Sequence, residues 1–203
     1  LRSTALLEVE WDSAAIRGAL TGAFAARDPL GLTPPWRRAF QNTPAGVAAS
    51  SIEGRGWAKG APAGRCDAMN LLVASLPGSP YLPFLEVGGR LTYPEGLEGG
   101  AEVAFGDAPT DRAAATTIER ALRLRREHGL GRAHLAFVDG LDWAGEGALV
   151  FLTGPLLVVL NTGDADLEVP GSYRLVAASR PTPECAESTV VPAETCCWFL
   201  PEN

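Results

Sequence analysis

The chain has 203 residues, of which 46% are hydrophobic and 20% charged, and this composition indicates a globular protein with one large domain or two small ones. A net charge of -7 and the absence of a basic block argue against nucleic acid and against an anionic membrane surface as partners. The longest apolar run, Ala148 to Leu160, is interrupted by Gly154-Pro155 and is shorter than the roughly 20 residues that a membrane helix needs. We therefore interpret it as buried strands.

The first part of the chain alternates strand-like and helical segments. Residues 4–10 are apolar and typical of a strand, and residues 12–27 place small apolar side chains on one helical face. A second helix is predicted near 65–75, a strand over 81–87, and the clearest helix from about 110 to Gly129. This strand-helix succession favours a parallel sheet.

From Arg132 onward the pattern changes to short β-type runs that are separated by turn residues such as Asp139-Gly140 and Gly154-Pro155. Even spacing of this kind predicts an antiparallel β-sandwich. The boundary between the two regions is placed near 129–132. The predicted strands are 133–139, 147–153, 155–161, 166–170, 172–179, 188–193 and 195–201.

The four cysteines do not have the spacing of a metal site, because no C-x-x-C occurs and both histidines are distant in sequence, so neither a metal nor another cofactor is expected. Cys196 and Cys197 lie in one strand-like run and should point to opposite faces. Either could pair with Cys185 across a hairpin in an oxidising compartment, whereas buried thiols are the alternative.

Several segments resemble the α-amylase-type glycoside hydrolases. The stretch "MNLLVASLPGSPYLPFLEVGG" (69–89) resembles the helix, "LPGTP" turn and strand around their eighth barrel strand. "ALRLRREHGLGRAHLAFVDG" (121–140) is similar to their last barrel helix and the entry to the C-terminal domain, and "LLVVLNTGD" (156–164) to a strand and turn of that domain. "LLEVEW" (6–11) is similar to their fifth-strand segment, which ends in the general acid, and "QNTPAGVAAS" (41–50) to the segment after strand seven.

The resemblance implies a fold of class α/β plus all-β. Residues 1–130 would form the second half of a (β/α)8 barrel, from strand five to strand eight, and residues 131–203 a C-terminal antiparallel β-sandwich. Half a barrel cannot close by itself. The first barrel half is therefore expected upstream, in a longer natural protein.

The same resemblance locates the residues that chemistry would need. Glu8 occupies the position of the general acid, while Thr43 and Pro44 stand where the family has the His and Asp that grip the sugar. Glu86 is the one acid kept in the loop after strand eight, and it and Trp57 are candidate ligand-binding residues. Proline cannot replace a carboxylate, so no catalytic residue is predicted and Glu8 is interpreted as a relic.

This loss of polar residues, together with "GRGW" (54–57), resembles one branch of the superfamily, the 4F2-type heavy chains of heteromeric amino-acid transporters. The resemblance implies a non-catalytic ectodomain on the extracellular side of the plasma membrane, attached through an upstream transmembrane segment. Its partner would be a multi-spanning transporter light chain, which the heavy chain brings to the plasma membrane.

Two alternatives stay open at this point. The chain could be the C-terminal half of an active retaining α-glucosidase or trehalose-processing enzyme in the cytoplasm, with Glu8 as the acid. It could also be a carbohydrate-binding module in which Trp57 and Trp143 stack on sugar.

Overall fold

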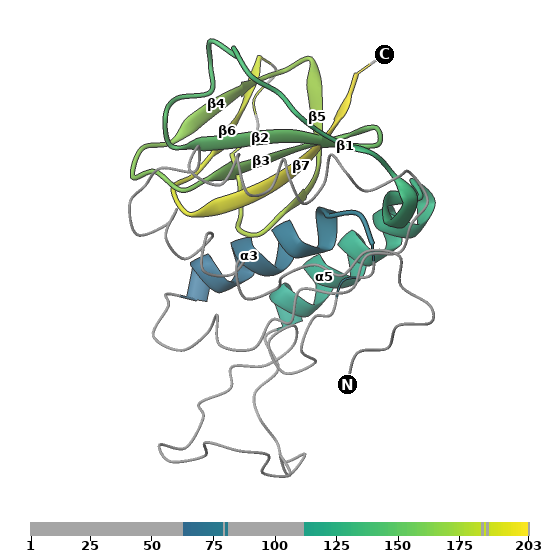
Figure 1. Ribbon diagram of the computed structural model, residues 1–203. Helices are drawn as coiled ribbons and strands as arrows, with labels where there is room; N and C mark the ends of the chain where they lie inside the picture. The colour runs from purple at the N-terminus through teal and green to yellow at the C-terminus, as the bar shows by residue number, and fades with distance from the viewer. Residues whose placement is uncertain (1–62, 79, 81–111, 184, 186, 203) are drawn as a thin grey trace, which may run out of the picture.

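The computed structural model describes residues 63–78, 80, 112–183, 185 and 187–202. These residues form three layers, with a two-stranded sheet on one side, a five-stranded sheet in the middle, and helices α3 and α5 on the other side (Figure 1). The predicted strands 4–10 and 81–87 and the predicted helix 12–27 lie outside the described residues.

Helix α3 (Ala63–Ser75) is buried on nearly all sides, and this confirms the helix predicted near 65–75. Every residue from Ala68 to Leu76 is buried, including the polar Asn70 and Ser75. A helix that is apolar around its whole circumference needs cover on every side. The five-stranded sheet and helix α5 provide part of that cover.

Helix α5 (Arg112–Glu127) is amphipathic. Ile118, Ala121 and Arg125 are buried, while the arginines and glutamates between them are mostly exposed. Gly129 ends the helical region as predicted, because its backbone is left-handed with φ of 63° and glycine adopts that conformation without a steric penalty. The short 3-10 helix η2 (Leu130–Arg132) then leads into the sheets.

All seven strands predicted beyond Arg132 are present, and every strand pair among the described residues is antiparallel, as expected. The larger sheet has the order β1-β2-β3-β7-β5, and the smaller sheet pairs β4 with β6. The strands are β1 (Leu135–Phe137), β2 (Ala148–Thr153), β3 (Leu156–Asn161), β4 (Leu167–Pro170), β5 (Tyr173–Ala178), β6 (Ser188–Val191) and β7 (Thr195–Pro201).

Asn161 organises the turn after β3 and explains the "LVVLN" motif physically. Its side chain is fully buried, and its Nδ2 donates to the carbonyl oxygens of Ala165 (2.8 Å), Val191 (3.1 Å) and Pro192 (3.1 Å). Its Oδ1 accepts from the backbone N–H of Gly163 at 2.9 Å. One amide therefore shapes the turn and fixes the end of β6 against it.

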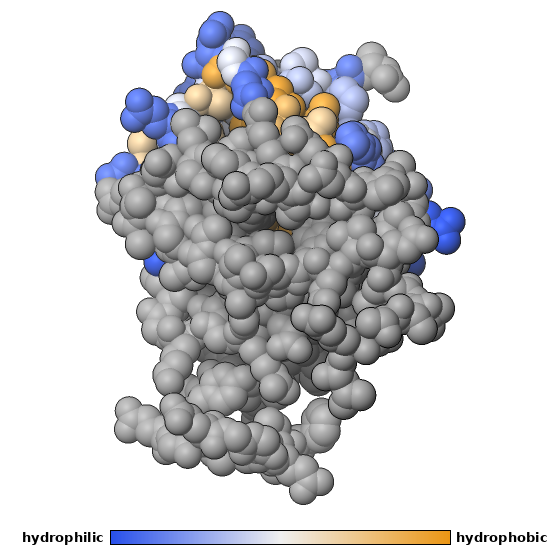
Figure 2. Space-filling model, viewed as in Figure 1, coloured by the Kyte–Doolittle hydropathy of each residue, from blue (hydrophilic) through white to orange (hydrophobic). Residues whose placement is uncertain are grey.

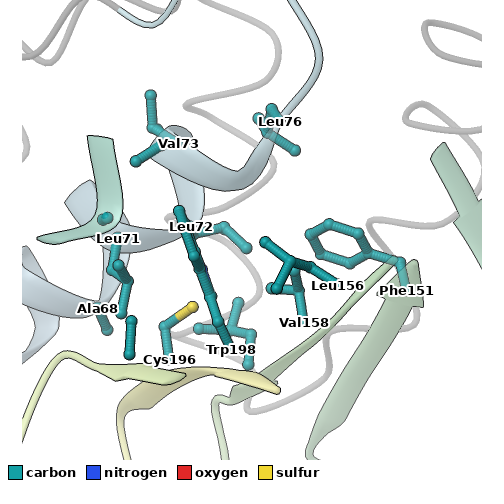
Figure 3. Packing of buried hydrophobic residues seen from close by; sticks show 14 of the residues in the cluster. Ala68, Leu71, Leu72, Val73, Leu76, Phe151, Leu156, Val158, Cys196 and Trp198 are labelled. Carbon is teal, nitrogen blue, oxygen red and sulfur yellow. The ribbon is translucent and has the colours of Figure 1, made fainter. Parts of the chain in front are cut away.

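The middle sheet separates two hydrophobic cores because side chains alternate along each strand. The core between this sheet and the helices contains Phe151, Val158 and Trp198, together with α3 residues such as Leu72 (Figure 3). The core on the opposite face contains Val159, Phe199 and other residues from the sheets, with Val169 of β4 and Val191 of β6 covering it. We call these the helix-side core and the strand-side core.

The N-terminal end of α3 is joined to the turn between β6 and β7. Arg65 forms an ion pair with Glu194, with Nε 3.1 Å from Oε1, and Glu194 has a left-handed backbone with φ of 53°. The guanidinium of Arg180 lies directly against Gly64, where a β-carbon would overlap it. The close approach of the Arg180 side chain to Gly64 therefore brings the helix and the sandwich together.

The division of domains at residue 130 remains a prediction.

Candidate functional site

Most of the predicted site residues lie outside the described part of the chain. These are Glu8, Thr43, Pro44, Trp57 and Glu86. Their mutual geometry therefore stays a prediction. Within the described residues, no group of three or more His, Cys, Asp or Glu side chains could hold a metal ion.

The "LPGSP" turn, which resembles the entry to the eighth barrel strand, is described from Leu76 to Gly78. Ser75 Oγ donates to the carbonyl of Leu72 at 2.6 Å, and Leu76 N–H donates to the carbonyl of Val73 at 3.2 Å, so the helix closes tightly. Gly78 has φ of 89°, a conformation that side-chain-bearing residues rarely adopt. The turn is thus built on a backbone shape that requires glycine.

Arg125 reaches this turn from α5. Its Nη1 donates to the carbonyls of Ala74 (2.9 Å) and Leu76 (2.5 Å), and its Nη2 donates to the carbonyl of Gly78. Only 7% of Arg125 is exposed. Burial lowers the pKa of its guanidinium to about 10, since a low-dielectric environment disfavours the charged form.

Sequence reasoning missed the role of Arg125, although a signal was present. The residue follows the helical spacing of Ile118, Ala121 and Leu122, which predicts an inward-facing position. An arginine in line with such residues must find several hydrogen-bond acceptors, because an unpaired buried charge is costly. The carbonyls at the end of a neighbouring helix are suitable acceptors.

Of the two alternatives for the cysteines, the structure has the thiols. Among the described cysteines, Cys185 is an exposed thiol and Cys196 and Cys197 are buried ones. Because β6 pairs with β4 and not with β7, the loop before β6 is not the hairpin partner of β7 that the pairing alternative assumes. Pairing in an oxidising compartment stays a prediction. The alternation prediction is confirmed, since Cys196 lies in the helix-side core and Cys197 in the strand-side core.

The pKa values of the Cys196 and Cys185 thiols are shifted in opposite directions. Burial, followed by the neighbouring Cys197, raises the pKa of Cys196 well above its usual value. The Ser188 side chain and the backbone around Glu187 lower the pKa of the Cys185 thiol. The Sγ of Cys185 lies 3.3 Å from Ser188 Oγ and 3.1 Å from its carbonyl oxygen.

The surface of the sandwich is acidic and mostly hydrophilic. Residues 131–203 contain three arginines and ten Asp or Glu residues, so this segment carries the whole net charge of -7 and residues 1–130 are balanced. Leu152 is the only exposed large hydrophobic residue among the described residues, and Figure 2 shows hydrophilic side chains around a smaller hydrophobic group on the visible described surface. The exposed carboxylates are Asp139, Asp142, Glu146, Asp164, Asp166, Glu168, Glu187 and Glu202.

Trp143, a candidate for sugar stacking, is half-buried and packs against the strand-side core. Part of its ring is therefore engaged in packing.

In the described part of the chain, neither helix has the length and apolar character that crossing a bilayer would require.

Comparison with known proteins finds similarity at the level of structure. No family model and no curated protein matches the sequence. The α-amylase of H. orenii superposes with a TM-score of 0.60 at 13% identity, over 95% of this chain and 48% of that one. Ttha1563 of Thermus thermophilus gives 0.62 at 19% identity, over 94% and 47% of the two chains. Amy13B of Eubacterium rectale gives 0.55 at 10%, over 93% and 46%.

The chain spans about half the length of these solved structures. Its antiparallel strands agree with the C-terminal sheets that the motifs indicated, while the predicted barrel half is not shown by the described residues. At these identities the likeness is one of fold, which this chain shares with about half of an α-amylase and of the two other solved structures.

Proposed function

We propose that this chain is the C-terminal part of a glycosidase-like protein that does not cleave sugars and serves as the heavy chain of an amino-acid transporter. The observation that carries the proposal is the Thr43-Pro44 pair, at the positions where active relatives have His and Asp. Retaining glycosidases need a pair of carboxylates and further polar groups that grip the sugar hydroxyls. A hydroxyl and a pyrrolidine ring supply neither a carboxylate nor an imidazole.

In this role the protein binds a multi-spanning light chain, brings it to the plasma membrane and stands on the extracellular side. A transmembrane segment of the parent protein, outside this chain, attaches it to the membrane. Amino-acid exchange is then a property of the complex.

The test uses the full-length parent protein in cells that express a transporter light chain. We expect surface labelling of the light chain to rise when the parent is co-expressed, and we expect the parent to release no product from an aryl α-glucoside. A matched variant, Thr43→His with Pro44→Asp, should leave trafficking unchanged, since the resemblance assigns these two positions to sugar binding and not to a light-chain contact. Unchanged light-chain labelling with and without the parent would refute the proposal.

A second candidate is an active α-glycoside hydrolase of which this chain is the C-terminal half. It is favoured by the structural neighbours, one of which is an α-amylase. Glu8 would then be the general acid. In that case the parent protein hydrolyses an aryl α-glucoside, Glu8→Gln abolishes turnover, and the control Glu10→Gln in the same segment retains it. Hydrolysis that depends on Glu8 would replace the heavy-chain proposal with this one.

A further inference from the structure

We propose that Arg125 is a positioning residue that locks the exit of helix α3 to helix α5 and to the first turn of the sandwich. This inference is independent of whether the parent protein cleaves sugar. It rests on the geometry of Arg125, the turn from Leu76 to Gly78, and Gly131 of η2.

The three acceptors of Arg125 lie on alternate residues along the chain. Ala74 belongs to the last turn of α3, Leu76 follows it and Gly78 ends the turn. Carbonyls at a helix C-terminus have no partners within the helix and carry partial negative charge, which a cation stabilises. A planar guanidinium with several N–H groups can serve three separated oxygens at once, whereas an ammonium is a compact point charge.

The hydrogen bonds of Arg125 within the described residues all go to backbone carbonyls and none to a carboxylate. Burial of an arginine without a carboxylate is unfavourable, and the lowered pKa of its guanidinium reflects that cost. Such an arrangement holds the backbone from Ala74 to Gly78 in place. An exposed arginine on the outer face of the helix, such as Arg126, makes no comparable contact in the described chain.

The turn is held from its other side by η2. Gly78 N–H donates to the carbonyl of Gly131 at 2.9 Å. A β-carbon at Gly131 would lie 3.3 Å from the Gly78 oxygen and 3.5 Å from Nη2 of Arg125, so the two backbones approach closely. Because η2 is followed within a few residues by β1, this contact connects the end of α3 directly to the start of the sandwich.

The consequence is that the end of α3 shares one small polar contact with α5 and η2, which lie about 50 residues later in the chain. Loss of the three guanidinium hydrogen bonds of Arg125 should release this turn locally and leave the sheet intact. The strands of the sheet make their own ladder of hydrogen bonds.

The experiment is amide hydrogen exchange on the full chain with Arg125→Lys, and with Arg126→Ala as the matched control on the same helix. We expect Arg125→Lys to accelerate exchange of the Gly78 amide by about 10-fold to 100-fold, as expected for the loss of charge-assisted hydrogen bonds. Amides of β3 and β7 should change by no more than about twofold. The control should leave all of these amides unchanged.

Uniform acceleration across the turn, β3 and β7 would overturn the proposal, because it would show that Arg125 contributes only to global stability. Full protection of Gly78 in Arg125→Lys would also overturn it, since a point charge would then suffice. If Arg125→Lys does not fold, Gly131→Ala provides the second test. Its methyl group meets the Gly78 oxygen, so the proposal requires local acceleration at Gly78 with β3 and β7 unchanged, and it fails if that acceleration is absent.

Discussion

The two faces of the five-stranded sheet are filled in different ways. The helix-side core joins residues from Ala68 to Trp198 and depends on chain segments that are distant in sequence. Among the described residues, the strand-side core is built from residues between Val138 and Phe199, and several of its members are half-buried. The strands and their connections therefore fill the core on one face of the five-stranded sheet, whereas the helices contribute to the core on its other face.

Strand β7 belongs to both cores. Cys196 and Trp198 face the helices, and Cys197 and Phe199 face the smaller sheet. Figure 3 shows Trp198 beside Cys196 and below Leu72 of α3. Substitutions at neighbouring positions of one strand can therefore test the two faces separately.

The largest effect is expected for Trp198→Ala. The side chain is fully buried, so its removal should lower the free energy of unfolding by about 3–5 kcal/mol, through lost transfer energy and a residual cavity. Urea denaturation measures this loss. Amide exchange in α3 should increase beyond the global change, because the indole lies against that helix.

Phe199→Ala is the matched variant for the opposite face. It should lower the free energy of unfolding by a similar amount. Amide exchange in α3 should then increase only as much as this lower global stability explains. Equal local loosening of α3 in both variants would contradict the separation of the two cores.

A smaller loss is expected for Asn161→Ala. The change leaves the carbonyls of Ala165, Val191 and Pro192 without this donor, and we expect a cost of about 1–3 kcal/mol in urea unfolding, because the bond to Val191 is buried while water can reach the part-buried ones. Asn161→Asp keeps the acceptor for Gly163 but loses the donors, so it should be at least as destabilising at neutral pH. A neutral result for Asn161→Asp would show that the turn does not need the amide.

The smallest effect concerns the thiols and depends on pH. The pKa of Cys196 is raised in the folded state, so the folded protein keeps its proton while the unfolded chain loses it above the usual thiol value of 9.0. Stability from this residue is therefore complete below about pH 9 and declines as the pH rises further. The stability difference between the wild type and Cys196→Ala should shrink from pH 8 to pH 10.5.

Alkylation provides the complementary measurement for Cys185. Its exposed side chain and lowered pKa predict faster reaction with iodoacetamide than an exposed thiol of ordinary pKa shows, since the thiolate is the reactive form. Cys196 should be protected in the folded state. Peptide mapping of the wild type and Cys185→Ser distinguishes them, and equal labelling of Cys185 and Cys196 would contradict the burial pattern.

The strand boundaries could be predicted from the sequence because they depend on nearby residues. Turns such as Gly154-Pro155 and the buried amide at Asn161 mark strand ends within a few residues, so each strand could be predicted from short-range patterns. Pairing is a long-range property. Nothing local predicts that β6 pairs with β4 outside the larger sheet, so the sequence left open whether Cys185 lies beside β7.

The candidate site was less predictable. Glu8, Thr43, Pro44 and Glu86 were identified through resemblance, and their arrangement stays a prediction because they lie outside the described residues. Arg125 could be predicted to face inward but not to bind a particular turn, because its acceptors lie about 50 positions earlier in the chain.

Because β7 contributes side chains to both cores, its register against β3 and β5 cannot shift by one residue without cost. Such a shift would turn every side chain of β7 to the opposite face. The indole of Trp198 would then have to fit the space beside Val169 and Val191, and the ring of Phe199 the space beneath α3. Related chains should therefore keep this register even where the connection at 192–194 differs in length.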